Sequence, residues 1–312
     1  MNKSRDMTFK KRGFGPFNFD FRSHYTFSPV KTLTFFLILV LIGTIVLISP
    51  ISRQETSDTA ITDALFTATS AVTLTGLTVQ TTSTFWTPFG QIVILLLILV
   101  SGSSYLSIST FLLIRISQWF SSKNTLSSGN TLGINRLNGF SRLTLKVVTF
   151  AIAIQILGSI ALFIQFYYAY PLHDSIWQAI SHAISSFNNS GFVFFSNVDN
   201  FSQFQNNKVL LITTMLITLI GGLGYIVFSD IMKSRSFTRL NLNSKLVVFC
   251  AGLLIIVGGI LILVLEYQNP DTLGSLSITD KIINSLFQSV SSRSSGFSSL
   301  NVGSTTESLN FL

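Results

Sequence analysis

The sequence predicts an all-α polytopic membrane protein built from parallel repeats of a helix, a re-entrant pore loop and a second helix. Three observations lead to this fold class. Only 10% of the residues are charged and 48% are hydrophobic. Apolar runs that could cross about 30 Å of hydrocarbon recur along the chain. Between these runs, a short polar-capped segment followed by a glycine element occurs three times, which indicates two complete units and one partial unit.

Five apolar runs are long enough to be predicted membrane spans. They cover residues 30–48, 89–114, 145–166, 209–228 and 246–265. The single cysteine, Cys250, lies inside the fifth run, so the sequence offers no disulfide framework and no thiol metal site. We expect Cys250 to be a small buried hydrophobic residue.

The charges predict the orientation of these spans. Most of the 20 basic residues lie in or beside the segments that precede the first span and follow the second and fourth spans. The opposite segments contain most of the 12 acidic residues and only Arg53, Lys208, Lys281 and Arg293 among the basic ones. This asymmetry favours a cytoplasmic N-terminus. It also accounts for the basic charge without nucleic acid, and anionic membrane lipid or a cytosolic protein is the expected partner.

A repeat organises the chain into units that run in the same direction. In each unit, a short re-entrant helix that begins at an acid or a hydroxyl precedes the glycine element. These short helices are predicted at 60–72, where Asp58 or Thr59 could be the N-cap, at 174–187 and at 279–292. The predicted organisation is a basic cytoplasmic segment 1–29, a first unit 30–118, a cytoplasmic loop 119–144, a second unit 145–233, a cytoplasmic loop 234–244 and a partial third unit 245–312.

The glycine elements predict a cation site built from backbone carbonyls. Each short helix directs the partial negative charge of its C-terminus toward the membrane centre. Glycine then supplies the φ freedom that lets successive carbonyls face one axis. No acid lies in the elements, which favours a monovalent cation over calcium or magnesium. The candidate ion-binding residues are Thr73, Leu74, Thr75 and Gly76 in the first unit, Asn188, Asn189, Ser190 and Gly191 in the second, and Ser294, Ser295 and Gly296 in the third.

Several polar residues beside these elements have two interpretations each. Arg293 is either a structural donor behind the third element, paired with an outer acid, or a charge that lowers ion occupancy. Asn188 and Asn189 either brace the second element from behind or offer side-chain oxygens to the ion. His173 and His182 either pack at a pore helix or act as a pH sensor or ion ligand.

Small residues interrupt the second and fourth spans. They are Ser101, Gly102, Ser103, Ser104 and Ser107 in the second span and Gly221, Gly222 and Gly224 in the fourth. Tight helix packing explains such residues in membrane bundles. The alternative is a wide hydroxyl-lined cavity with a flexible lower segment.

Residues 64–77, 188–192 and 287–297 carry a resemblance to a known family. Over residues 30–312 the chain resembles the Trk/Ktr/HKT superfamily of potassium transporters and is most similar to the bacterial Ktr-type membrane (pore) subunit. The resemblance implies potassium-channel-like units around one central pore and potassium uptake across the bacterial plasma membrane. It also implies sodium dependence, a homodimer and a ring-forming cytosolic nucleotide-binding regulator. Gly76 matches the potassium-type residue of the first filter, and the implied ions are potassium and sodium.

Other function classes fit the sequence less well. It contains no His-Glu-x-x-His, Walker or Gly-x-Ser-x-Gly pattern, so no enzyme activity is expected. A secondary transporter that binds another solute at the midplane would show inverted repeats. Because the four-unit pattern is incomplete at Leu312, we expect a C-terminally truncated fragment, and a non-conducting fragment is the second alternative.

Overall fold

The computed structural model describes residues 29–54, 60–103, 136–168, 170–195, 201–234 and 236–310. Within these ranges the structure is helical and contains no strand, apart from one isolated bridge between Arg53 and Trp86. The all-α fold class is thus confirmed. The helices are α1 (Pro29–Ile48), α2 (Ala60–Thr73), α3 (Thr82–Phe85), an apolar helix at Pro88–Ser103, α5 (Arg136–Phe166), α6 (Leu172–Phe187), α7 (Lys208–Ser234), α8 (Leu242–Glu266), α9 (Ile278–Ser294) and α10 (Glu307–Asn310).

The predicted spans coincide with long apolar helices. Among the described residues, three helices are long and apolar enough to cross a membrane, at Leu145–Phe166, Lys208–Ser234 and Leu242–Glu266. Two shorter apolar helices, Leu33–Ile48 and Pro88–Ser103, lie in the first and second predicted spans. The remainder of the second span, from residue 104 on, lies outside the described residues.

The outward surface of α8 is apolar, as expected for a helix in contact with lipid. Phe249, Leu253 and Val257 are all exposed there. Cys250 is exposed too, so the prediction that it is buried was wrong. Hydropathy identifies residues that avoid water, but in a membrane it does not separate lipid contact from protein contact.

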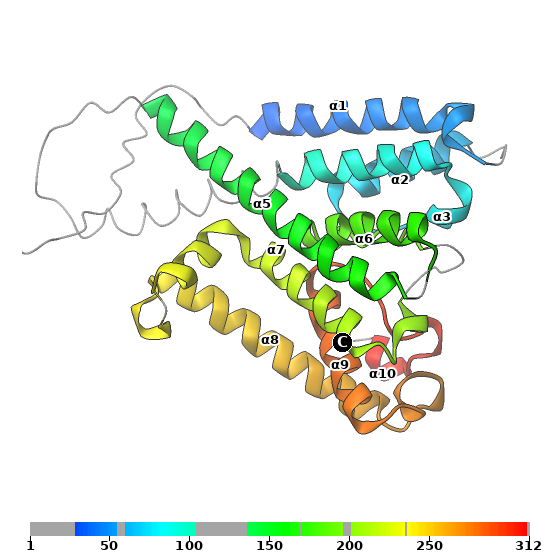
Figure 1. Ribbon diagram of the computed structural model, residues 1–312, viewed down its shortest axis with the longest axis vertical. Coiled ribbons are helices and arrows are strands. Elements are labelled where there is room, and N and C mark those ends of the chain that lie inside the picture. Colours follow the sequence, from blue (N-terminus) through cyan, green and yellow to red (C-terminus); the bar gives the residue numbers. More distant parts are fainter. Residues whose placement is uncertain are drawn as a thin grey trace, which may run out of the picture.

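The same pair of elements occurs three times along the chain. A long helix packs against the short helix that follows it, and the pairs are α1 with α2, α5 with α6 and α8 with α9. Figure 1 shows these pairs following one another across the molecule in chain order, with α7 between the second and third pairs. The long helix always comes first, which agrees with repeats that run in one direction.

The short helices match their predicted ranges closely, with one exception at a start. α9 begins after Ser277, whose hydroxyl accepts a hydrogen bond from the Asp280 backbone N–H (3.3 Å). α6 begins at Leu172, directly after Pro171, and has no side-chain cap. The expectation of an acid or hydroxyl at its start was therefore wrong. Pro171 instead marks the position at which the helix begins, and Asp174 lies in its first turn. Asp58 and Thr59, proposed for the first short helix, lie outside the described residues.

α7 is bent and packs closely behind the second glycine element. Its bend is at Gly224, where φ is 75° and ψ is 164°. One turn earlier, a Cβ atom built on Gly221 would collide with the carbonyl oxygen of Phe187, the last residue of α6. Gly221 is therefore a packing residue, whereas Gly224 changes the direction of the helix.

Small residues of the helix at Pro88–Ser103 also serve packing. The Ser101 hydroxyl donates to the carbonyl of Val72 near the end of α2. A Cβ atom on Gly102 would collide with the side chain of Asn188. Two residues of the proposed hydroxyl-lined cavity, Ser104 and Ser107, lie outside the described residues. Ser101 thus ties this helix to α2 within the first unit, whereas Gly102 packs against the second unit.

The hydrophobic core lies around the glycine elements and fixes their flanks. One cluster contains Phe187, Phe287 and Phe297 and joins the second and third units. Another contains Trp86, from the segment after the first element, and Phe192, from the second. Phe192 and Phe297 directly follow glycines and are only 0% and 2% exposed. Their burial anchors the second and third elements in the core.

The segment after the third element is attached to α8 by a buried carboxylate. Glu266 is 0% exposed. One of its oxygens accepts from the backbone N–H (2.8 Å) and the hydroxyl (2.6 Å) of Thr306. The other accepts from Thr272 (2.6 Å) and Asn269 (2.7 Å). These donors satisfy a buried charge that would otherwise be costly, so Glu266 holds this segment in place.

Candidate cation-binding site

Three glycines follow the short helices in a backbone conformation that other residues rarely adopt. Gly76 follows α2, Gly191 follows α6 and Gly296 follows α9, with φ angles of 73°, 75° and 73°. A side chain in the left-handed region typically costs about 1–2 kcal/mol. The repeat of sequence is therefore also a repeat of backbone geometry.

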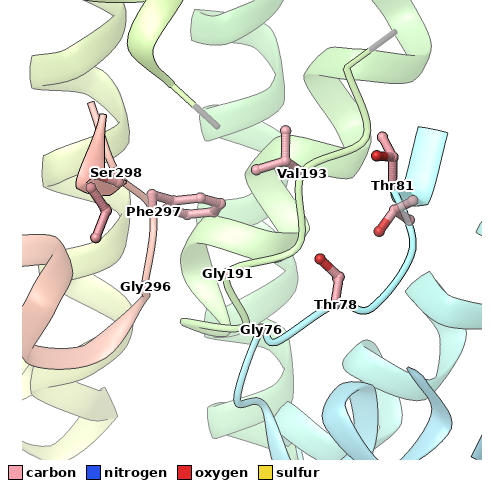
Figure 2. A pocket seen from close by; sticks show the side chains of 10 residues that line it. Gly76, Thr78, Thr81, Gly191, Val193, Gly296, Phe297 and Ser298 are labelled. Atoms are coloured by element: carbon pink, nitrogen blue, oxygen red, sulfur yellow. The ribbon is translucent and has the colours of Figure 1, made fainter. Parts of the chain in front are cut away.

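The three glycine elements meet at one place, although they are far apart in the sequence. Figure 2 shows Gly76, Gly191 and Gly296 on three neighbouring segments. In each unit, the carbonyl oxygen just before the glycine lies against the glycine of another unit. A Cβ atom built on Gly76 would lie 2.5 Å from the carbonyl oxygen of Ser190. One built on Gly191 would collide with the carbonyl oxygen of Ser295, and one built on Gly296 would lie 4.0 Å from that of Thr75. Each glycine thus has a carbonyl of another unit as a neighbour, in the cyclic order first to second, second to third and third to first unit.

A cavity of about 220 Å³ opens beside this meeting point. All three glycines line it, together with hydroxyl and apolar side chains and no acid. The other lining residues are Thr78, Thr81, Thr82, Val193, Phe297, Ser298 and Val302 (Figure 2). Hydroxyl and carbonyl oxygens can replace the water around a cation without adding a fixed charge.

A buried serine on each short helix hydrogen-bonds to the element that follows, and the sequence interpretation overlooked it. The backbone carbonyl of Ser70 accepts from Thr75 N–H (3.1 Å), that of Ser185 from Ser190 N–H (2.9 Å), and that of Ser291 from Gly296 N–H (2.9 Å). Their hydroxyls also reach the elements, and the pairs are Thr75 with Ser70 (3.0 Å), Ser185 with Ser190 (2.9 Å) and Ser291 with Ser295 (3.0 Å). The signal in the sequence was a serine at a near-constant distance before each glycine.

The start of each element differs between units. Leu74 and Asn189, two residues before their glycines, have φ angles of 58° and 54°, which is unusual outside glycine. Ser294 is the last residue of α9 and is not among the residues with positive φ. The third element is one residue shorter here, so it needs no second left-handed residue. Thr73 belongs to α2, and its hydroxyl donates to the Thr69 carbonyl (2.7 Å).

The side chains of Asn188 and Asn189 both hydrogen-bond to protein groups. The Asn188 amide donates to the Ile184 carbonyl (2.9 Å). With its amide oriented to satisfy its neighbours, Asn189 donates to the Thr218 carbonyl and the Ser294 hydroxyl and accepts from the Gly222 N–H, all at 3.3 Å. These contacts favour the bracing interpretation for both residues.

Arg293 lies behind the third element, next to α7. A Cβ atom on Gly222 would be 3.0 Å from one guanidinium nitrogen of Arg293, so the absence of a side chain there makes room for it. The residue is half-buried. No acid in the described ranges comes within ion-pair distance of the guanidinium. The expected pairing with an outer acid therefore has no support in this part of the chain.

His182 joins the second unit to the third. It is 2% exposed, and its Nε2 lies 3.0 Å from the Thr214 hydroxyl and 3.2 Å from the Ser186 hydroxyl. Its ring packs against those of Phe201 and Phe297, with centroids 4.6 and 5.0 Å away. His182 thus packs behind the elements, as the structural interpretation proposed. The other candidate, His173, is exposed and lies 3.5 Å from Asp174.

The arrangement offers oxygen dipoles rather than charged ligands. The C-termini of α2, α6 and α9 lead into the elements, and each helix has an acid in its first turn. This places the negative ends of three helix dipoles beside the meeting point. The described residues contain no group of three or more His, Cys, Asp or Glu side chains that could hold a metal ion. Chemically, the site suits a cation bound by neutral oxygens.

Long apolar helices, repeated short helices and a glycine-centred meeting point define an all-helical membrane protein. Residues 16–312 match the family described as TrkH, cation transport protein. The chain belongs to this family.

Curated relatives place the chain near bacterial ion uptake proteins. It is 33% identical over 282 residues to the Ktr system potassium uptake protein B of Bacillus subtilis, covering 90% of this chain and 62% of that protein. It is also 33% identical over 274 residues to the potassium/sodium uptake protein NtpJ of Enterococcus hirae, covering 88% of this chain and 60% of that one. The chain thus spans about three fifths of the length of these relatives.

A solved structure has the same fold. The crystal structure of the potassium transporter TrkH from Vibrio parahaemolyticus is similar with a TM-score of 0.62 at 18% sequence identity. The match covers 90% of this chain and 54% of that chain. At this identity the likeness supports the fold alone.

Proposed function

We propose that this chain forms part of a potassium uptake pore, in which the three glycine elements are filter segments. The observation that carries the proposal is the cyclic contact between the carbonyls of Thr75, Ser190 and Ser295 and the glycines of other units. Relatives named for potassium uptake and for potassium/sodium uptake support the choice of ion.

The proposed mechanism is replacement of the hydration shell by backbone oxygens. A cation entering from the hydroxyl-lined cavity would exchange water for carbonyls of the elements. The negative ends of α2, α6 and α9 would lower the cost of bringing a positive charge to this depth. The absence of acids from the lining favours a monovalent ion that gives up water readily. We propose potassium as this ion, held by the elements 73–76, 188–191 and 294–296.

The finer features of the proposal come from the resemblance. They are sodium dependence, a homodimer, a cytosolic nucleotide-binding ring and a bacterial plasma membrane location with a cytoplasmic N-terminus. The unit boundaries 30–118, 145–233 and 245–312 belong to the same proposal. Arg293 is proposed as a filter-adjacent residue. A transporter with inverted repeats is disfavoured because the long helix precedes the short one in all three pairs.

The direct test is growth at limiting potassium of host cells that lack their own potassium uptake. The cells would express the chain from its complete reading frame, and initial rates of potassium and sodium uptake would be measured. We expect rescue of growth and faster uptake of potassium than of sodium. Failure to rescue growth by protein that has reached the membrane would contradict the proposal.

Gly76→Ser tests the role of the first element. The new side chain must take a positive φ, and its Cβ would lie 2.5 Å from the Ser190 carbonyl oxygen. We expect the ratio of potassium to sodium uptake to fall about tenfold, which corresponds to about 1.4 kcal/mol. Gly252→Ser is the matched control, because nothing lies within 4 Å of its Cβ position on α8. An unchanged ratio in Gly76→Ser would count against a filter role.

A further inference from the structure

One buried hydroxyl in the second unit holds residues on both sides of the glycine. The Ser185 hydroxyl donates to the carbonyl of Phe192 (2.7 Å) and lies 2.9 Å from the Ser190 hydroxyl. Because a serine hydroxyl has one proton, Ser185 can only accept from Ser190 while it donates to Phe192, and the Ser190 hydroxyl also lies 3.4 Å from the Ser185 carbonyl oxygen. We call this arrangement of Ser185, Ser190 and Phe192 a hydroxyl clasp. It spans Gly191, whose φ is 75°.

The third unit contains an equivalent clasp. The Ser291 hydroxyl donates to the carbonyl of Phe297 and lies 3.0 Å from the Ser295 hydroxyl. The segment between Ser291 and Gly296 is one residue shorter than the segment between Ser185 and Gly191. The same hydrogen bonds form in spite of this deletion. Shared helix geometry alone does not produce that result, so the clasp is a feature of the elements themselves.

The first unit has only half of this arrangement. Thr75 donates to the Ser70 hydroxyl (3.0 Å), but no hydrogen bond from Ser70 to the residue after Gly76 is formed within the described ranges. That residue, Leu77, is 64% exposed, whereas Phe192 and Phe297 are buried. The carbonyls around Gly76 are thus held less firmly than those around Gly191 and Gly296.

We propose that Ser185 and Ser291 are positioning residues that determine the selectivity of the site between potassium and sodium. The inference rests on the proposed function. A smaller ion is favoured when carbonyls can rotate inward to meet it, and the number and freedom of carbonyl dipoles govern this choice. The clasps prevent such rotation because the hydroxyl ties the Ser190 or Ser295 residue to the carbonyl beyond the glycine. Ser185 and Ser291 themselves do not contact the ion.

The first test replaces each serine by alanine in the complete reading frame. In Ser185→Ala and Ser291→Ala, both hydrogen bonds of the clasp are lost. We expect the ratio of potassium to sodium uptake to fall about three- to tenfold, the range that the loss of about one net hydrogen bond would give. Ser70→Ala is expected to have the smallest effect of the three, because its arrangement lacks the second bond.

Matched controls separate the clasp from general loss of a buried hydroxyl. Ser285 on α9 is 1% exposed and donates only to the Lys281 carbonyl of its own helix (2.7 Å). Ser181 on α6 is 0% exposed and likewise donates to the Gln178 carbonyl (3.2 Å). Ser285→Ala and Ser181→Ala should keep the wild-type ratio. A fall in these controls as large as in Ser291→Ala and Ser185→Ala would overturn the proposal.

A double variant tests whether the two hydroxyls act together. If Ser185 and Ser190 belong to one clasp, Ser185→Ala/Ser190→Ala should lose little more selectivity than Ser185→Ala alone. Independent, additive effects would contradict the clasp. Where an alanine variant does not accumulate in the membrane, the cysteine variant takes its place, since it is close in size and a weak donor. An unchanged ratio in Ser185→Cys and Ser291→Cys would also overturn the proposal.

The outcomes distinguish this inference from the proposed function. If the wild-type protein takes up no potassium, the proposed function fails. If it takes up potassium selectively and both clasp variants keep its ratio, only the positioning role fails.

Discussion

Arg293 carries a permanent positive charge behind elements that we propose to bind cations. Two unit charges about 10 Å apart repel by about 2 kcal/mol at an effective dielectric constant of about 20. The C-terminal dipole of α9, equivalent to about half a negative charge, offsets part of this repulsion. The remaining repulsion would lower ion occupancy and speed release. The absence of an acid beside the guanidinium in the described ranges favours this tuning role over a buried ion pair.

Arg293→Gln tests the tuning role. We expect the protein to accumulate normally and the half-saturating potassium concentration to fall about three- to tenfold, because the repulsive charge is removed while an amide donor remains. Uptake measured over a range of potassium concentrations gives this value. Arg293→Lys keeps the charge and should stay close to the wild type. Loss of assembled protein on mild detergent extraction of Arg293→Gln would instead favour a structural ion pair.

The sequence was enough to predict the glycines of the site, but not the serines that hydrogen-bond to the glycine elements. Gly76, Gly191 and Gly296 could be singled out because positive φ has a specific sequence preference. Serine has no such preference in a membrane helix, where it also bonds to its own helix, as Ser285 does. The roles of Ser185 and Ser291 depend on where the chain returns after the glycine. That information is in the tertiary structure.

At the scale of elements, the bend in α7 depends on one glycine. Gly224 combines a φ of 75° with a ψ of 164°, a region populated almost only by glycine. Nothing lies within 4 Å of a Cβ atom there, so the requirement is conformational and not steric. The bend allows Tyr225 and Phe228 to pack against Phe150 of α5, with ring centroids 5.6 and 4.9 Å apart.

Gly224→Ala is therefore expected to destabilise the protein by about 1–3 kcal/mol, the typical cost of an unfavourable backbone region. Thermal unfolding of the detergent-solubilised protein measures this loss as a lower midpoint. Gly252→Ala is the control, because it lies within α8 and also has an open Cβ position. In a regular helix, alanine is favoured over glycine, so the control should be neutral or slightly more stable. Equal effects of the two substitutions would argue against a role for the bend.

Element boundaries were predictable because the lengths of the apolar runs and the polar residues at the helix starts can be seen directly in the sequence. The predicted short helix at 174–187 differs from α6 only at its start, where Pro171 and not a side-chain cap ends the preceding segment. The predicted span at 246–265 lies within α8. The orientation of each helix about its axis was not predictable, as Cys250 illustrates. A helix that is apolar on all sides contains no periodic signal for the face that meets protein.

For the whole molecule, the charge distribution predicts which loops lie in the cytoplasm. In a Cys250→Ala background, which removes the single cysteine, Asn206→Cys probes the exposed segment before α7, and Thr125→Cys probes the segment 119–144 that the sequence predicts to be cytoplasmic. We expect a membrane-impermeant thiol reagent to label Asn206→Cys in intact cells. Thr125→Cys should react only after the cells are permeabilised. The reverse labelling pattern would invert the proposed topology.

The repeat was predictable at this scale, but the contacts between units were not. The order of long and short helices follows from hydropathy and capping signals along the sequence. Contacts such as that of Asn189 with Ser294 join residues from different units. No local pattern specifies them, because they depend on how the units assemble.

The cyclic order of glycines and carbonyls also constrains how the units can diverge over time. A side chain added at Gly76 would displace the carbonyl of Ser190, and one added at Gly191 would displace that of Ser295. A substitution at a glycine of one unit therefore disturbs the backbone of the neighbouring unit. Second-site suppressors of a lesion at Gly76 should accumulate in the segment around Ser190 and not in the first unit. The three elements are thus coupled, so that a change tolerated in one of them depends on the sequence of its neighbour.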